Sequence, residues 1–206
     1  MSLRARTAAS AALLALLLSA CSGTEAEPAE EVGGEEPASE EQAEQVADPL
    51  AWGETAEVIG DNGTPLELTP VAVHYATAEE VGGEEGIDAP DNGLYAAVQI
   101  EAVALEGPET TTAPIDGGGW AWRQDGQQYS TVDGTATMAP WVGSVPEFTV
   151  DAPILPGEDA TVGFESFDIP EAGGHLAYTD AAGAMVRWEA PAESDDIPEV
   201  EEWIGQ

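Results

Sequence analysis

The feature that most limits the fold of this chain is the spacing of apolar residues between residues 50 and 190. They occur in short runs rich in Val, Ile, Leu, Thr and aromatic residues, separated by Asp-Asn-Gly, Asp-Gly and Pro-Gly turns. Short runs bounded by turn signals are typical of strands, and no stretch shows a convincing helical period. The pattern predicts an all-β fold, an antiparallel β-sandwich of two sheets.

Two of the predicted strands carry the clearest signals. In residues 64–76 the apolar phase slips across Thr69 and Pro70, which predicts a bulge or bend at the proline. In residues 94–105 two sets of side chains alternate, so one face should be buried and the other wetter. The buried set is Leu94, Ala96, Val98 and Ile100, and the wetter set is Tyr95, Ala97, Gln99 and Glu101. The other expected strands are 54–59, 120–123, 128–132, 161–169, 175–179 and 184–189.

Three motifs between residues 50 and 190 resemble those of a known family. They are the long strand 94–105, the run Trp-Ala-Trp-Arg-Gln-Asp-Gly-Gln-Gln-Tyr at 120–129, and Leu-Pro-Gly-Glu at 155–158 followed by Phe-Asp-Ile-Pro at 167–170. Together they resemble the immunoglobulin-like (telokin-like) domain of bacterial lipoproteins, a family of unknown function. The plan is also similar to that of small secreted mycobacterial immunogenic antigens. The resemblance implies a sandwich fold and brings no catalytic residue.

The N-terminus has the pattern of an export signal. Arg4 and Arg6 precede an apolar run at residues 8–18, which is too short to span a bilayer comfortably. The run ends on Leu18, Ser19, Ala20 and Cys21, which resembles a lipobox, with cleavage after Ala20 and a lipid on the Cys21 thiol. We therefore expect a signal peptide at 1–20 and localisation at the extracellular face of a cell membrane through palmitate-type lipid on Cys21.

Cys21 is the only cysteine, so the exported domain must be stable without disulfides. Residues 21–49 are rich in Glu, Ala, Pro and Gly with almost no large apolar residue, which predicts a disordered acidic linker. Residues 50–190 form the predicted sandwich, and residues 191–206 are predicted to be an acidic C-terminal tail.

The charge of the chain is strongly acidic. There are 4 Lys and Arg residues against 41 Asp and Glu, a formal net charge of -37, and no lysine is present. A surface of this sign repels phosphate backbones, so nucleic acid is not an expected partner. The excess acid is interpreted as adaptation to high salt, with binding of cations or of a basic partner as the alternative.

The sequence offers little catalytic chemistry. It has two histidines, His74 and His175, and no Gly-x-Ser-x-Gly elbow, and without lysine a Ser-x-x-Lys motif is impossible. Carboxylate pairs are uninformative among so many acids. The Asp-Asn-Gly sequences at 61–63 and 91–93 could supply oxygen ligands to calcium, but turn formation explains them better because Asn and Gly accept positive φ. We expect no catalytic residue, no metal site and no cofactor.

The tryptophans are best explained as core residues, as in many sandwiches. Trp141, in a loop between Pro140 and Val142, is the exception and is predicted to be an exposed ligand contact. The sequence thus predicts an exported, lipid-anchored protein with a non-catalytic binding module, whose partner is an unknown extracellular protein or cell-wall component. The alternatives are a cell-envelope hydrolase that uses loop carboxylates, and a structural, salt-adapted spacer.

Overall fold

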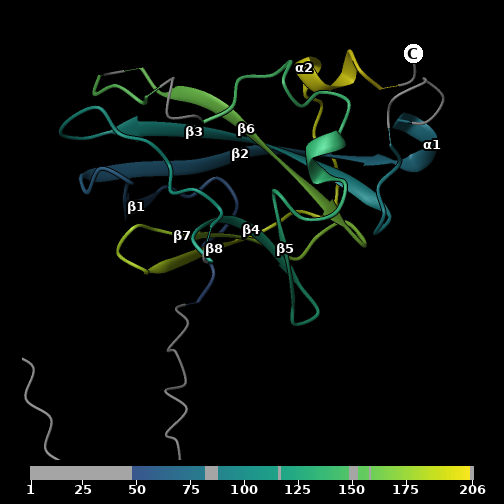
Figure 1. Ribbon diagram of the computed structural model, residues 1–206, viewed down its shortest axis with the longest axis horizontal. Helices are drawn as coiled ribbons and strands as arrows, with labels where there is room; N and C mark the ends of the chain where they lie inside the picture. Colours follow the sequence, from purple (N-terminus) through teal and green to yellow (C-terminus); the bar gives the residue numbers. More distant parts are fainter. Residues whose placement is uncertain (1–47, 82–87, 116, 149–152, 158, 205–206) are drawn as a thin grey trace, which may run out of the picture. The chain divides into compact units, whose positions relative to one another are not determined.

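The computed structural model describes residues 48–81, 88–115, 117–148, 153–157 and 159–204. The main elements are two four-stranded antiparallel sheets that face each other (Figure 1). The first sheet has the order β1-β2-β3-β6, and the second has the order β5-β4-β7-β8. The bounds in the first sheet are β1 Ala56–Ile59, β2 Pro65–Thr77, β3 Leu94–Ala104 and β6 Thr161–Ile169. Those in the second are β4 Gly119–Gln124, β5 Gln127–Ser130, β7 His175–Thr179 and β8 Met185–Glu189. The predicted antiparallel β-sandwich is confirmed.

The chain changes sheet three times, after β3, β5 and β6. An immunoglobulin constant domain also changes sheet three times, but its second strand pairs with a strand from later in the chain. Here β2 instead pairs with β3, the next strand along the chain, and the two form a long antiparallel pair from Leu66↔Ala104 to Thr77↔Leu94. Strand β6 then pairs with β3 and becomes the edge of the first sheet. The position of β6 at this edge determines where the cavity described below can form.

The bulge predicted in β2 from the slip in its apolar alternation is present. The register with β3 shifts between Pro70 and Ala72, so Val71 has no partner of its own. Before the shift Leu66 and Leu68 are buried, and after it Val73 and Tyr75 are buried. A bulge at this point lets one long strand keep its apolar side chains in the core on both sides of the proline.

The main core lies between the two sheets and is rich in aromatic side chains. Trp122 contacts Tyr75 edge-on at 6.1 Å between ring centroids and packs against Phe167 at 5.7 Å. Trp120 lies between Tyr178 and Trp188. The contacts of Trp122 link β4 to β2 and β6 across the two sheets, and those of Trp120 join β4 to β7 and β8 within the second sheet. The rings of Trp122, Tyr75 and Phe167 thus connect the sheets without a disulfide.

The outer face of the first sheet is covered, which the sequence did not predict. Tyr95 and Ala97, expected on a wetter face, are completely buried. They belong to a second apolar cluster with residues from the loop after β5 and from the C-terminal segment. The members outside the sheet are Val81, Ala139, Trp141, Val145, Ile197 and Val200. Over part of the first sheet the protein therefore has three layers, which are the second sheet, the first sheet and these outer segments.

The C-terminal segment forms part of this outer layer. The Asp195 backbone amide donates a 2.7 Å hydrogen bond to the Val73 carbonyl oxygen, and the Asp195 carboxylate accepts one from the Val73 amide. The short helix α2, Pro198–Glu201, buries Val200, and Ile197 immediately before it is also buried. Within the predicted acidic C-terminal tail, Ile197 and Val200 thus pack with Ala76 of β2 and Tyr95 of β3.

Two further short helical turns lie in the connections. Helix α1, Ala78–Val81, begins after Thr77, whose hydroxyl accepts a hydrogen bond from the Glu80 amide while Glu80 accepts one from the Thr77 amide. This reciprocal pair is a capping box, and its Thr-x-x-Glu spacing is visible in the sequence. The 3-10 turn η1, Ala136–Met138, begins the loop that carries Trp141.

Candidate functional site

The structure corrects the prediction for Trp141. Its side chain is completely buried, and its indole Nε1 donates a 2.8 Å hydrogen bond to the Ser166 hydroxyl on β6. Its ring meets Tyr95 of β3 edge-on, with 6.0 Å between centroids. The loop carrying Trp141 folds back over the first sheet, so the tryptophan anchors the loop and is not an exposed ligand contact. Leu18, Ser19, Ala20 and Cys21 lie outside the described residues.

The histidines are not brought together. His74 lies on β2 with its Nδ1 atom 3.0 Å from the Asp195 carbonyl oxygen, and His175 begins β7 in the other sheet opposite Arg123. Among the residues that the structure describes, no group of three or more His, Cys, Asp or Glu side chains is placed to hold a metal ion.

The two Asp-Asn-Gly sequences form turns, with positive φ at Gly63 and Gly93. Each turn also binds a buried carboxylate from elsewhere in the chain. The Asn92 amide donates to Asp168 Oδ1 at 2.9 Å, and the Asp91 amide donates to Asp168 Oδ2 at 3.0 Å. The Asn62 amide donates in the same way to Glu109 Oε1 at 2.7 Å. Here the Asp-Asn-Gly turns supply backbone N–H groups to carboxylates.

Glu109 shows how this chain stabilises a buried acid without lysine. Oε1 accepts hydrogen bonds from the Asn62 and Thr110 amides, and Oε2 accepts them from the Thr64 amide and hydroxyl. Burial acts to raise the pKa of Glu109, but these hydrogen bonds outweigh it and hold the pKa below its ordinary value. The carboxylate ties the β1–β2 turn to the segment after β3.

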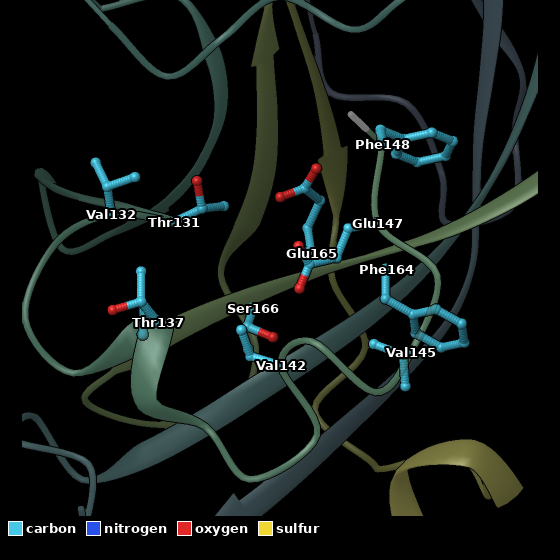
Figure 2. A pocket seen from close by; sticks show the side chains of 11 residues that line it. Thr131, Val132, Thr137, Val142, Val145, Glu147, Phe148, Phe164, Glu165 and Ser166 are labelled. Atoms are coloured by element: carbon cyan, nitrogen blue, oxygen red, sulfur yellow. The ribbon is translucent and has the colours of Figure 1, made fainter. Parts of the chain in front are cut away.

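A cavity of about 180 Å³ lies along the edge of β6 that does not pair with β3, beside the loop that runs from the end of β5 through η1 (Figure 2). Figure 2 shows Thr131, Val132 and Thr137 on one side of the two glutamates, and Phe148 and Phe164 on the other. The apolar lining consists of Val132, Ala136, Val142, Val145, Phe148 and Phe164. The polar lining consists of Thr131, Thr137, Glu147, Glu165 and Ser166.

Glu165 and Glu147 give the cavity its chemical character. Glu165 is half-buried on β6, whereas Glu147 is exposed and its Oε1 accepts a 3.1 Å hydrogen bond from the Gly143 amide. Removal of the Glu165 carboxyl from water, with a smaller contribution from the negative charge of Glu147, raises the pKa of Glu165 to about 8. No described residue donates a hydrogen bond to the Glu165 carboxyl. It therefore differs from Glu109, which has four donors.

A second hollow, of about 440 Å³, lies at another part of the sandwich and is lined by residues that include Asp61, Thr112 and Asp180. The Asp180 carboxylate already accepts hydrogen bonds from the Ile59, Ala182 and Ala184 amides. Its acceptor capacity is thus used to hold the β7–β8 turn against β1. The cavity at β6 is the better candidate because its carboxyl group has no such donors.

Glu165 is not among the site residues predicted from the sequence, although β6 contains a signal for it. The side chains of Phe167 and Ile169 point into the main core, and strand alternation gives Glu165 the same phase. A glutamate at an inward position of a strand is unusual and marks a residue that needs a partner or a function. Glu147 could not be found in this way because the path of its loop determines where it lies.

The site can perform three kinds of chemistry. A protonated Glu165 can donate a hydrogen bond, an ionised Glu165 beside Glu147 can hold a positive charge, and the two together can exchange a proton. The hydroxyls of Thr131 and Thr137 add polar groups to the lining. The apolar residues around them favour a ligand that also has a hydrocarbon part.

The described residues include no helix that is long and apolar enough to cross a membrane. No family model and no curated protein sequence matches the chain. Among solved structures the chain is similar to MPT63, a secreted protein from Mycobacterium tuberculosis. The two share 18% sequence identity with a TM-score of 0.44, over 69% of this chain and 98% of the other. The similarity to secreted mycobacterial antigens expected from the sequence is confirmed in part, and membership of the lipoprotein family stays a prediction.

Proposed function

We propose that this chain is an exported lipoprotein that holds a non-catalytic β-sandwich binding module at the extracellular face of a cell membrane. The lipid on Cys21 anchors it, and the acidic linker at 21–49 carries the module away from the bilayer. At 3.3 to 3.6 Å per residue such a linker reaches roughly 90 to 100 Å when fully extended. That reach takes the module from the membrane surface into the layer outside it.

The observation that carries the binding function is the cavity at the edge of β6. It joins an apolar lining with a Glu165 carboxyl that receives no hydrogen bond from the described residues. An unsatisfied polar group in a hollow costs free energy unless a ligand or water pairs with it. The cavity supports a binding module over a purely structural spacer, which needs no concave site.

A cell-envelope hydrolase is the second candidate, because Glu147 and Glu165 lie in one cavity and Glu165 has the raised pKa of a general acid. The volume of about 180 Å³ argues against it, since pockets for ligands of drug size are roughly 300 to 1,000 Å³. Incubation with purified cell-wall glycan distinguishes the two. The binding module releases no reducing ends, whereas a hydrolase releases them and loses that activity in Glu165→Gln.

The anchor is tested by Cys21→Ser. Without the thiol no diacylglycerol can be attached, so we expect the protein to move from the membrane fraction to the medium or to accumulate as uncleaved precursor. The measurement is the distribution and apparent mass of the protein after fractionation of the producing cells. Ser19→Ala is the matched control, because it keeps a small residue before the cleavage point and should leave processing normal. A Cys21→Ser protein that is processed and membrane-bound like the wild type contradicts the anchor.

A further inference from the structure

We infer that the cavity at the edge of β6 binds an alkylammonium group, with the hydrocarbon part against the valine and phenylalanine side chains and the positive charge between Glu165 and Glu147. This inference rests on the proposed binding function and names the class of ligand. The source of the group is a lysine side chain of a basic partner or a free small amine, and the same site chemistry serves both.

The two walls of the cavity carry the argument. Val132 and Phe148 supply apolar surface on the side of β6 that carries the Glu165 carboxyl (Figure 2), while Glu165 and Glu147 supply negative charge on the strand and on the loop. Lysine-type groups bury an apolar stem and keep a charged head near polar partners. The cavity offers a stem site and a head site within about 180 Å³, which suits one extended side chain better than a sugar ring.

The charge of the whole protein favours the same ligand. With a net charge of -37 and no lysine of its own, the chain attracts cations over its whole surface. Most of that attraction is nonspecific and is screened by salt. Glu165 differs from the surface acids because it lies in the wall of an apolar cavity beside a second carboxylate, where screening is weaker and a cation is worth more.

Calcium fits the cavity less well than an amine. Calcium takes six to eight oxygen ligands, usually from several carboxylates. The described lining has two carboxylates, and no described group of three acidic or histidine side chains is placed for a metal. The apolar lining would also face a hydrated calcium ion with no favourable contact. A compact ammonium on a hydrocarbon stem matches both parts of the lining.

Binding must be coupled to the ionisation of Glu165. Glu147 and Glu165 are the titratable residues in the described lining, and both favour the ammonium when they are ionised. An ammonium ion next to Glu165 lowers the pKa of that carboxyl, so binding releases a proton. Affinity should therefore rise as the pH increases from about 6 to about 9, while the alkylammonium itself, with an ordinary pKa of about 10.4, stays charged.

The test is a titration of the protein from residue 21, with Ser in place of Cys21, in 0.15 M NaCl at pH 7.5. The probe is n-butylammonium chloride, and n-butanol is the neutral probe of similar size. Methyl signals of Val132, Val142 and Val145 report binding in the cavity by NMR. We expect n-butylammonium to shift these signals at a concentration at least tenfold lower than n-butanol does. Glu165→Gln should remove that tenfold preference, and Glu101→Gln on the exposed face of β3 should leave it unchanged.

Each other outcome overturns the inference in a distinguishable way. Equal binding of both probes shows an apolar binding cavity, which keeps the proposed binding function and overturns the ligand class. No shift with either probe overturns both the inference and the use of this cavity in the proposed function. Tighter binding of calcium chloride than of n-butylammonium replaces the amine by a metal ion.

A third probe distinguishes the two sources of the group. Nα-acetyl-lysine methylamide carries the lysine side chain on a peptide backbone. If it binds at least as tightly as n-butylammonium, the site accepts a lysine of a partner protein. If it binds tenfold more weakly, the mouth of the cavity admits a free amine only.

Discussion

Trp141→Ala is expected to lower the free energy of unfolding by about 3 to 5 kcal/mol, the usual cost of truncating a fully buried tryptophan. The indole fills the space between the loop after η1 and the outer face of the first sheet, next to Tyr95. The truncation leaves a void there and removes the hydrogen bond to Ser166. Urea unfolding followed by circular dichroism measures the loss.

Two variants make this prediction specific. Trp141→Phe keeps a ring against Tyr95 but cannot donate to Ser166, so it should cost less than Trp141→Ala. Trp203, which is 40% exposed, is the matched control, and Trp203→Ala should change stability by no more than about 0.5 kcal/mol. If Trp141→Ala is as mild as Trp203→Ala, the tryptophan is not buried and the original prediction of an exposed contact is restored.

Glu109→Gln is expected to lower the free energy of unfolding at pH 7 by about 3 to 5 kcal/mol, although it changes the size of the side chain very little. Each carboxylate oxygen of Glu109 accepts two hydrogen bonds. In glutamine one of these oxygens is replaced by an NH₂ group. This NH₂ group is a donor and would face two groups that are themselves donors. Hydrogen bonds to a charged group are worth about 1.5 to 3 kcal/mol each, and the backbone amides left without an acceptor add to the loss.

The cost of Glu109→Gln should depend on pH. The pKa of Glu109 is lowered in the folded protein, so its stabilising contribution is complete above the ordinary glutamate pKa and disappears as the pH falls through the lowered value. The difference between wild type and variant should therefore be large at pH 7 and small below that lowered pKa. Exposed Glu106 provides the control, because Glu106→Gln should have little effect at either pH. A difference that persists unchanged in acid would show that packing, and not the charge, stabilises this site.

The sandwich could be predicted from the sequence because its signals are local. Short apolar runs between turn signals located β6 and β7 at their observed bounds, and the phase slip at Pro70 located the bulge in β2. Both signals depend on residues that are close in the chain, since side chains alternate between the two faces of a strand. The Asp-Asn-Gly turns are of the same kind, because the positive φ of Gly63 and Gly93 is a local requirement.

The outer layer could not be predicted because it depends on contacts between distant segments. Tyr95 and Ala97 alternate with core residues, and only the position of the loop around Trp141 and of helix α2 makes them buried. In the sequence Ile197 and Val200 are two apolar residues among many acids, which is weak evidence for packing. The candidate site could be predicted only in part for the same reason. The alternation of side chains along β6 marks Glu165, but only the path of the loop brings Glu147 beside it.

The central claim is that the edge of β6 forms a cavity in which the half-buried carboxyl group of Glu165 lies beside Glu147 and binds a cationic group. The most direct test is the ¹³C chemical shift of the Glu165 carboxyl carbon, followed by NMR from pH 4 to pH 10 without and with n-butylammonium. We expect a midpoint at about pH 8 for the free protein and a lower midpoint when the amine is present. A midpoint near the ordinary glutamate value of 4.5, unchanged by the amine, would show a solvated surface acid and would contradict the account.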